Sequence, residues 1–426
     1  MQYWNTTTHK YLLPVIFLIF SSLSVFGQDN SPYSRYGIGT LKAIENVANR
    51  GMGGISITDN SSLIANPTNP ATYTGLKLTS FQVGFESASV GLKSSNGSNK
   101  TGYTVLSYLN IGMPLSKKIG VSFGLMPFTR SKYSMEQTDQ LPFSSVTNSY
   151  YGGGGTQKIY IGGAYKQGDF SIGLNTGYLF GNIVNTSDNK FQDSLKILSN
   201  SLTSRTTVGG VFWQLGALMD KKIVDEYSLK LGMTYTGMQS LNARKEAYWQ
   251  TYFGDINDPL YSTIVDSVAD VKGKIKLPSM LGVGASIANG DFWQVGVDFN
   301  SSDWSNYSSY GQSDSMTKSW SLKVGGALTP DVNSVNNYWK KMTFRAGAYT
   351  GQDILQLNGT TLKKAGVTVG LGYPIRRTNL SIGQLNASLD VGKRGTTDNG
   401  LLREGYTRFC VGFTFNDKWF IKRRYD

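Results

Sequence analysis

The stretch RGMGGISITDNSSLIANPTNPA, residues 50–71, decides how the rest of the chain is interpreted. It carries three glycines and two Asn-Pro pairs: Gly51, Gly53, Gly54, Asn66-Pro67 and Asn69-Pro70. Glycine permits positive φ and close backbone approach, whereas proline pushes the residue before it out of the helical region. Asp59 and the serines after it can satisfy nearby backbone groups through their side chains. The stretch therefore predicts a compact irregular segment in which no helix forms.

The first 27 residues have the pattern of a secretory signal peptide. Lys10 precedes the apolar run YLLPVIFLIF, and the small residues Val25 and Gly27 precede an expected cut ahead of Gln28. The run is short of the roughly 20 apolar residues that a membrane-spanning helix needs, and no later stretch approaches that length. No cysteine lies near the cut, which argues against a lipid-modified N-terminus. The mature chain is expected to be either soluble or a membrane β-barrel.

Composition excludes several classes of function. The only histidine is His9 in the expected signal peptide, and the only cysteine is Cys410. Hydrolases built on Ser-His or Asp-His need an imidazole, zinc sites need histidine or several cysteines, and one cysteine forms no internal disulfide. The aspartates in TSDNKFQD (186–193) and GDINDP (254–259) match no calcium-loop spacing. We therefore expect no enzyme, no metal and no cofactor.

The charge balance indicates an anionic neighbour. Forty-one Lys and Arg residues outnumber 28 Asp and Glu residues, which gives a formal net charge of +13. For an exported barrel this neighbour would be outer-membrane lipid headgroups or lipopolysaccharide. No recognisable nucleic-acid module carries a basic patch, so nucleic acid is not an expected partner.

From residue 77 to residue 416 the chain repeats segments that alternate apolar with small or polar residues. DFWQVGVDF, for example, places Trp293, Val295, Val297 and Phe299 on one side and Gln294 and Asp298 on the other. A strand with one lipid-facing and one wet face has this period. Fourteen such segments lie near 77–92, 101–113, 118–132, 155–166, 169–183, 205–220, 226–241, 273–288, 291–303, 317–328, 341–350, 365–374, 380–391 and 406–416.

The connections between these segments alternate in length. Most of those after even-numbered strands are short, whereas 133–154, 184–204 and 242–272 are long and are expected to be external loops. The glycines of YYGGGG, residues 150–155, are expected to be a hinge in the first of these loops. The fold class is therefore all-β: a 14-stranded antiparallel transmembrane β-barrel over 77–416. A basic tail, 417–426, with Lys422, Arg423 and Arg424, is expected in the periplasm, either solvated or bound to a partner.

The expected width of the barrel suggests a role for residues 50–71. Eight strands leave a lumen that side chains can fill, and sixteen leave an aqueous channel. A barrel of 14 strands needs something to fill it, and residues 28–76 are the only non-strand segment of suitable size. We expect this segment to be an N-terminal plug in the lumen.

The plug resembles a known family. Its arginine, glycines, acidic residue and Asn-Pro-Ala motif resemble the hatch of the FadL-like outer-membrane proteins, the long-chain fatty acid transporter group: Arg50, Gly51, Gly53, Gly54, Asp59 and Asn69-Pro70-Ala71. The doubled NPTNPA departs from the single motif of that family. SPYSRYGIG, residues 31–39, resembles a Bacteroidetes branch of the family, which includes secretion-associated members. The resemblance implies a plugged 14-stranded barrel in the outer membrane of a Gram-negative cell.

Two candidate sites follow for hydrophobic ligands. Pro127 interrupts the third strand, which predicts a bulge or kink there, or a strand that has already left the membrane. The family resemblance implies a lateral exit at such a kink, with the candidate residues Gly124, Leu125, Met126, Pro127 and Phe128. The aromatic residues of the long loop 242–272 are candidates for a capture groove, or for packing within the loop: Tyr248, Trp249, Tyr252 and Phe253.

Two functions remain open at this point. One is passive uptake of small hydrophobic molecules through the plugged lumen, with a lateral exit. The other is a non-transporting accessory barrel in an outer-membrane secretion or barrel-assembly complex, held by its loops or its tail.

Overall fold

The computed structural model describes residues 30–419 except 96, 143, 193–196, 225, 255, 257–261, 335–336 and 377–380. The expected signal peptide and the cations Lys422, Arg423 and Arg424 of the tail lie outside the described residues. Within the described ranges, no helix is long and apolar enough to cross a bilayer.

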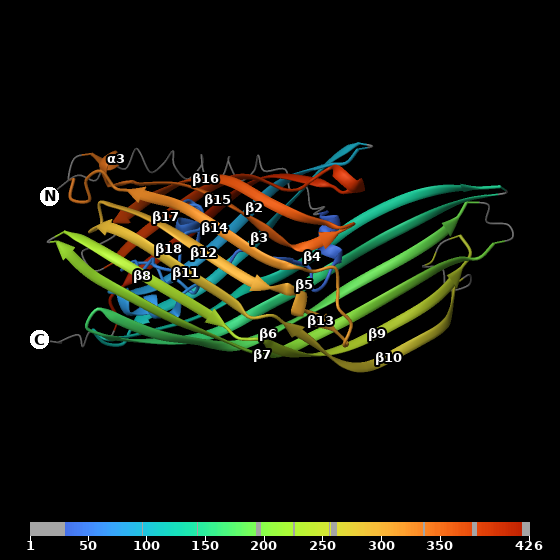
Figure 1. Cartoon of the computed structure of the whole chain (residues 1–426), viewed down its shortest axis with the longest axis horizontal. Coiled ribbons are helices and arrows are strands. Elements are labelled where there is room, and N and C mark those ends of the chain that lie inside the picture. The colour runs from blue at the N-terminus through green and yellow to red at the C-terminus, as the bar shows by residue number, and fades with distance from the viewer. Residues whose placement is uncertain are drawn as a thin grey trace, which may run out of the picture.

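The wall of the molecule is one closed antiparallel sheet (Figure 1). We call each full-length strand of the wall a stave. β8 and β9 together form one stave, and β10 and β11 together form another, so the sixteen named strands of the wall make 14 staves. The strands are β2 (Thr79–Lys93), β3 (Ser98–Pro114), β4 (Ile119–Leu141), β5 (Ser144–Gln167), β6 (Phe170–Phe191), β7 (Ser199–Val224), β8 (Tyr227–Thr236), β9 (Gln239–Tyr252), β10 (Ser262–Leu277), β11 (Met280–Asn289), β12 (Trp293–Asp303), β14 (Lys318–Leu328), β15 (Thr343–Leu357), β16 (Thr360–Arg376), β17 (Ser381–Gly395) and β18 (Arg403–Asp417).

The sequence prediction of a 14-stranded barrel is confirmed. β18 pairs with β2 and β9 pairs with β10, so the sheet closes and no edge runs the length of the wall. All 14 predicted segments overlap a stave. The short elements are η1 (Pro32–Arg35), β1 (Thr40–Leu41), α2 (Val47–Arg50), η2 (Pro70–Gly75), η3 (Trp304–Asn306), β13 (Ser308–Ser309), α3 (Tyr338–Lys341) and η4 (Asp398–Gly400).

The prediction of three long external loops is wrong. Most of 133–154, 184–204 and 242–272 is strand, because β4 and β5, β6 and β7, and β9 and β10 continue as paired hairpins. In Figure 1 these strands project well beyond the end of the others. The polar alternation of these hairpins lacks the apolar face of a lipid-facing strand, and this led the sequence analysis to interpret them as loops.

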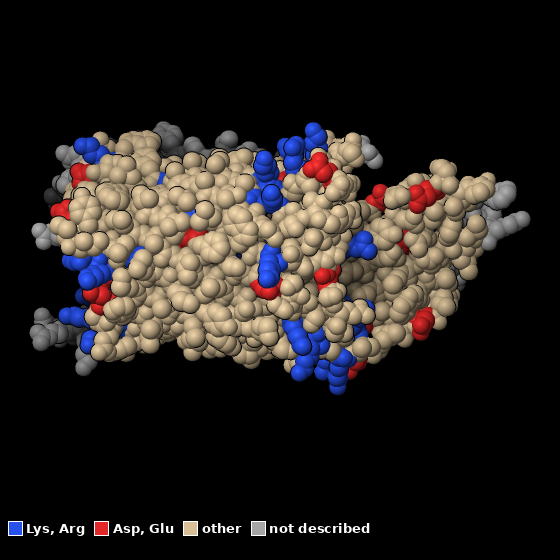
Figure 2. Space-filling model, in the orientation of Figure 1, with Lys and Arg blue, Asp and Glu red and all other residues tan. Residues whose placement is uncertain are grey.

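The outer surface has the belt of a membrane barrel. In the middle of β16, Val367 is 62% exposed and Val369 is 56% exposed, whereas Thr368 between them is buried. The same period places Trp293, Val295, Val297 and Phe299 outside and Asp298 inside. Figure 2 shows the result as a wide band almost free of charged side chains. Exposed apolar side chains in a continuous band are stable only against lipid.

This belt makes a stability prediction. Val369→Arg places a cation on the lipid face of β16 and should lower the free energy of unfolding in bilayers by about 2–4 kcal/mol, whereas Thr361→Arg, on the same face nearer the strand end, should cost about 0–1 kcal/mol. Denaturant unfolding in lipid vesicles, followed by tryptophan fluorescence, measures both. Equal losses at the two positions would contradict the placement of the belt.

Candidate functional site in the barrel lumen

The N-terminal segment, residues 30–78, lies inside the wall and contacts staves around its whole circumference. Its hydrogen bonds reach opposite sides of the barrel: Tyr73 donates to Asn175 of β6 at 2.9 Å, and Gly53 donates to Thr368 of β16 at 2.7 Å. Most of its residues from Val47 to Thr74 are buried. The segment thus fills the middle of the lumen.

The glycines bring this segment against the wall. A Cβ on Gly51 would lie 2.9 Å from the Cα of Gly370, so both positions need to lack a side chain. Gly53 has φ of +72°, and a Cβ there would lie 2.8 Å from the carbonyl oxygen of Val324. The close approach places the backbone N–H of Gly53 on the hydroxyl of Thr368.

The two Asn-Pro pairs fix the turn of the segment. The Asn66 side-chain amide donates to the carbonyls of Ser56 and Asp59, and the Asn69 amide donates to the carbonyls of Ile57 and of Ala217 in β7. Asn69 is extended, as expected before proline, but the expectation that no helix forms here is wrong. The 3₁₀ helix η2 begins at Pro70 itself, because proline is tolerated at the first helical position.

Ion pairs hold the segment from the side of the lumen opposite the termini. Glu86 of β2 contacts both Arg50 at 2.7 Å and Lys42 at 2.8 Å, and Lys323 of β14 pairs with Glu45. Burial would raise the pKa of Glu45, but the adjacent Lys323 ammonium lowers it to about 2. Buried charges are costly unless they are paired, so these contacts fix the segment in one position.

The sequence analysis identified Arg50 but missed its partner. Glu86 and Lys323 lie on the inward parity of otherwise ordinary strands, as does Asp298 of β12, whose Oδ2 accepts the backbone N–H groups of Ser56 and Ile57 at 2.7 and 2.9 Å. A carboxylate on the polar parity was visible in the sequence. The residue that pairs with such a carboxylate could not be predicted, because the pairing depends on the register of strands that are far apart in the chain.

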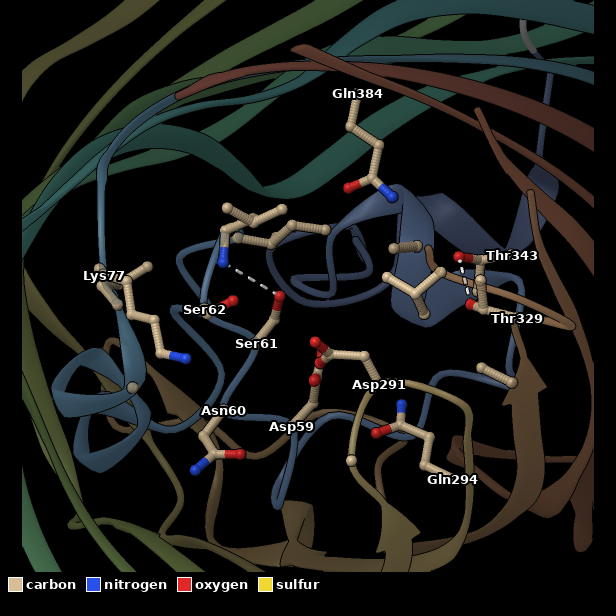
Figure 3. A pocket seen from close by; sticks show the side chains of 18 of the residues that line it. Asp59, Asn60, Ser61, Ser62, Lys77, Asp291, Gln294, Thr329, Thr343 and Gln384 are labelled. Carbon is tan, nitrogen blue, oxygen red and sulfur yellow. Dashed lines mark hydrogen bonds between the residues drawn. The ribbon is translucent and has the colours of Figure 1, made fainter. Parts of the chain in front are cut away.

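At the end of the barrel that holds the short turns, the segment leaves a wide pocket of about 1140 Å³. Figure 3 shows Asp59, Asn60, Ser61 and Ser62 at its centre, with Lys77 to one side and Asp291, Gln294, Thr329 and Thr343 on the other. Burial raises the pKa of Asp59 in spite of the nearby cations Lys230 and Arg345. The pocket has many polar and charged lining residues and opens to solvent, so we call it the vestibule.

A second cavity, of about 470 Å³, lies on the other side of the segment. One part of its wall is apolar: Leu41, Phe128, Leu179, Phe212, Leu277 and Met280. Lys158 of β5 enters this part, is 8% exposed, and places its ammonium 5.7 Å from the centre of the Phe212 ring. Among the described residues it has no hydrogen-bond or ion-pair partner. In this part of the cavity the Lys158 ammonium therefore lies against apolar side chains.

A lid covers this cavity toward the projecting end. Trp304, Tyr307 and Met316, from the connection between β12 and β14, pack in one buried cluster with Tyr33 and Ile38 of the N-terminal segment. The carboxylate of Asp314 accepts the backbone N–H of Gly37 at 2.6 Å. The connection between β12 and β14 is therefore tied to the N-terminal segment.

Beside the cavity the strand pairing of the wall is interrupted. β3 and β4 pair only from Leu109↔Leu125 to Pro114↔Gly120, and beyond Leu125 the two strands separate. The pairing of β4 with β5 is irregular between Pro127 and Thr129, opposite Gln157 and Thr156, and the glycines of YYGGGG pair with the residues of β4 that follow. That stretch is therefore not the loop hinge expected from sequence. It lies inside β5, where Gly154 and Gly155 have positive φ.

The five candidate exit residues fall on both sides of this separation. Gly124 and Leu125 make the last pairs with β3, Met126 is buried opposite Lys158 of β5, and Phe128 lines the cavity. The structure thus brings them next to the cavity, although their role in passage remains a prediction.

Residues 30–42, here called the strap, cover the free edge of β4 from inside. β1 pairs Thr40 with Arg130 and Leu41 with Thr129. Nearer the N-terminus, Ser31 donates its backbone N–H to Lys132, and the Ser34 hydroxyl both donates to the carbonyl of Lys132 and accepts its N–H. The strap therefore replaces the missing strand β3 as the hydrogen-bond partner of β4.

The four candidate capture residues do not form a loop. Tyr248, Trp249 and Tyr252 belong to β9, and Phe253 follows directly. Tyr252 is buried and donates its hydroxyl to Asp188 of β6 at 2.7 Å, so it packs inside the projecting hairpins. None of the four lines the apolar cavity. A capture role for the exposed Tyr248 and Trp249 remains a prediction.

These features define a class of protein: a 14-stranded membrane barrel with its lumen filled by its own N-terminal segment. Solved structures with this fold include the CymD monoaromatic hydrocarbon channel (14% identity, TM-score 0.54, covering 90% of this chain and 99% of that one). A FadL homologue of Pseudomonas aeruginosa is 13% identical, with a TM-score of 0.56 over 90% of this chain and all of that one. The Pseudomonas putida toluene transporter TodX is 18% identical, with a TM-score of 0.56 over 91% and 100%.

The chain belongs to the BamG family, whose family model matches residues 9–426. No curated protein is detectably similar to it. The likeness in fold agrees with the resemblance of the N-terminal segment to FadL-like barrels. The Bacteroidetes branch suggested by SPYSRYGIG stays a prediction.

The pair of Glu45 with Lys323 predicts how the segment responds to acid. A carboxylate whose pKa is lowered on folding stabilises the fold above its ordinary pKa, and this contribution is lost only as the pH falls through about 2. The N-terminal segment should therefore resist limited proteolysis equally at pH 7 and pH 5, whereas Glu45→Gln should expose it at both. Glu136→Gln, at an exposed carboxylate of β4, is the matched control. Release of the wild-type segment already at pH 5 would contradict this assignment.

Proposed function

We propose that this protein is an outer-membrane barrel of a Gram-negative cell, of the Bacteroidetes branch suggested by residues 31–39, that admits small hydrophobic molecules by passive uptake. The observation that carries the proposal is the apolar cavity that meets the wall where β3 and β4 part. A hydrophobic molecule that leaves by this gap enters the bilayer directly and avoids the polar vestibule. Two of the three similar structures are named as a monoaromatic hydrocarbon channel and a toluene transporter, which supports the proposal.

Lys158 narrows the ligand class. An ammonium in an apolar cavity without a partner is poorly solvated, and a ligand that offers one acceptor or anionic group beside an apolar body relieves this cost. The favoured ligand is therefore a small amphiphile rather than a pure hydrocarbon. The mature chain has no histidine, and we propose no catalytic step on this ligand.

The strap is the gate of the proposed exit. It occupies the edge of β4 through hydrogen bonds along Phe128–Lys132, and the gap opens to the cavity only when these bonds break. Backbone groups freed in this way face the lumen, where water or the ligand can satisfy them, so the exchange is less costly than it would be in lipid.

A second function is favoured by the projecting hairpins. Residues 262–274 of β10 pair with β9 on one side, and among the described residues no strand pairs with their other side. An exposed strand edge is a site where another chain can add a strand. We therefore keep as the alternative a non-transporting accessory barrel in a secretion or barrel-assembly complex. Purification in mild detergent separates the two: a stoichiometric protein partner supports the accessory role, and a solitary barrel with a bound small molecule supports uptake.

Locking the strap should stop uptake. Thr40 and Arg130 are register partners, and such Cα atoms lie about 4.5–5.5 Å apart, within the range of a disulfide. In a Cys410→Ser background, Thr40→Cys with Arg130→Cys should block entry of a labelled amphiphile when oxidised and restore it when reduced. The two single variants are the controls. Uptake at the wild-type rate by the fully cross-linked protein would rule out the strap as the gate.

Removing the proline should narrow the exit. Proline lacks the N–H that a ladder needs, so Pro127→Val restores a donor at the irregular point of β4 and lets the strand pair further. Uptake should fall severalfold at equal surface abundance. Pro374→Val, in β16 on the far side of the wall, is the control and should leave uptake unchanged. If Pro127→Val takes up the compound normally while its structure shows regular pairing through residue 127, the lateral exit is wrong.

A further inference from the structure

Five cations form a row on the outer face of five adjacent staves. β16, β17, β18, β2 and β3 each contribute one exposed residue to it: Lys363, Lys393, Arg403, Lys93 and Lys100. Arg403 and Lys93 are direct register partners across β18 and β2. The other members are offset by two residues: Lys393 pairs with Ala365, Gly405 pairs with Lys393, and Lys100 pairs with Gly91. We call these five residues the cation row.

Among the described residues the row has no ion-pair partner. On the same strands, Glu86, Asp390 and Glu404 are on the inward parity, where they pair with luminal cations, and Asp417 lies at the opposite end of β18 from Arg403. None of the five row residues makes an ion pair or a side-chain hydrogen bond with any part of the chain that the structure describes. Like charges directly opposite each other in a sheet are destabilising, so Arg403 beside Lys93 is a cost that the fold alone does not offset.

The level of the row is that of the lipid headgroups. On β17 the outward residues Leu385, Leu389 and Val391 precede Lys393, and on β18 Phe409, Val411, Phe413 and Phe415 follow Arg403 across the belt. The eleven residues from Gly383 to Lys393 span roughly 25 Å along the barrel axis at the usual strand rise and tilt, which is the height of a lipid-facing band. In Figure 2, Lys and Arg side chains gather where the uncharged band ends, on the side away from the chain termini.

The row is continuous over five adjacent staves. Other exposed cations lie on separate staves, Lys318 on β14 beside Asp303 and Lys272, Lys274 and Lys276 on β10, whereas β5 has no Lys or Arg from Ser144 to Gln157 and β6 has none before Lys190. An unbroken row of five unpaired cations is suited to one anionic partner that spans these staves.

We propose that the cation row is a binding site for the phosphorylated headgroup of an outer-leaflet lipid lying against β16, β17, β18, β2 and β3. Its acyl chains would pack on the exposed apolar residues of the same strands while its phosphates face the five cations. The proposal rests on the outer-membrane location proposed above, but not on uptake. Bound phosphate would relieve the repulsion between Arg403 and Lys93 and tie three hairpins of the rim together.

The test measures binding of lipid A to the mature protein in detergent, by native mass spectrometry. The wild-type protein should bind bisphosphorylated lipid A at least about tenfold more tightly than its dephosphorylated form, since each cation adds to the attraction. A variant with glutamine at all five positions of the row should lose this preference. A variant with Arg at the four lysines and Lys at position 403 should keep it.

The control removes the same number of charges from the rim that holds the short turns. Its substitutions are Lys117→Gln, Lys118→Gln, Lys221→Gln, Lys222→Gln and Lys340→Gln. It should keep the preference, so a loss there as large as in the row variant would overturn the site in favour of net charge alone. An unchanged preference in the row variant would also overturn it, as would displacement of the lipid by equimolar inorganic phosphate. Heat-modifiable gel mobility establishes that each variant is folded, and uptake is measured separately.

Discussion

The need to pair every backbone N–H and C=O group across the bilayer governs this structure. At thirteen of the 14 junctions between staves, backbone groups pair with the neighbouring strand over most of the length of the shorter strand. The junction of β3 with β4 is the exception, because pairing stops at Leu125. The strap meets the need there instead, through β1 and the Ser34 hydroxyl, so the N-terminal segment completes the wall as well as filling the lumen. The hydrogen bonds between the strap and β4 thus cover the gap between β3 and β4, and the proposed exit requires the same bonds to break.

The charges follow from the same arrangement. A segment that carries Lys42, Glu45 and Arg50 into the lumen needs partners on the inward faces of strands, and Glu86 and Lys323 supply them. Each such pair ties the N-terminal segment to a different stave. Lys158 lies in the same region without a partner, beside Met126 at the point where the wall parts. The unpaired ammonium of Lys158 therefore lies next to the place where β3 and β4 stop pairing.

Alternation in the sequence was enough to predict the 14 staves, because a strand between lipid and a polar lumen must repeat every two residues. It failed for β9 and for the far ends of β4 to β7, where both faces meet water or protein and the period is lost. The glycines and Asn-Pro pairs of residues 50–71 indicated a packed segment. Its anchors on Thr368, Asp298 and Asn175 depend on where distant strands bring their inward residues, which no local pattern records.

The position of the strap constrains the order in which the chain can fold. Tyr33 bonds to Leu402, just before the last stave, and Ser34 bonds to β4, so two neighbouring residues of the strap contact both early and late strands of the sheet. A closed sheet then surrounds them. Contacts of such high sequence separation are slow to form, and a polar segment cannot be threaded through a finished wall in lipid. The contacts of the strap are therefore complete only when both β4 and β18 are in place, so the two ends of the sheet share one internal partner.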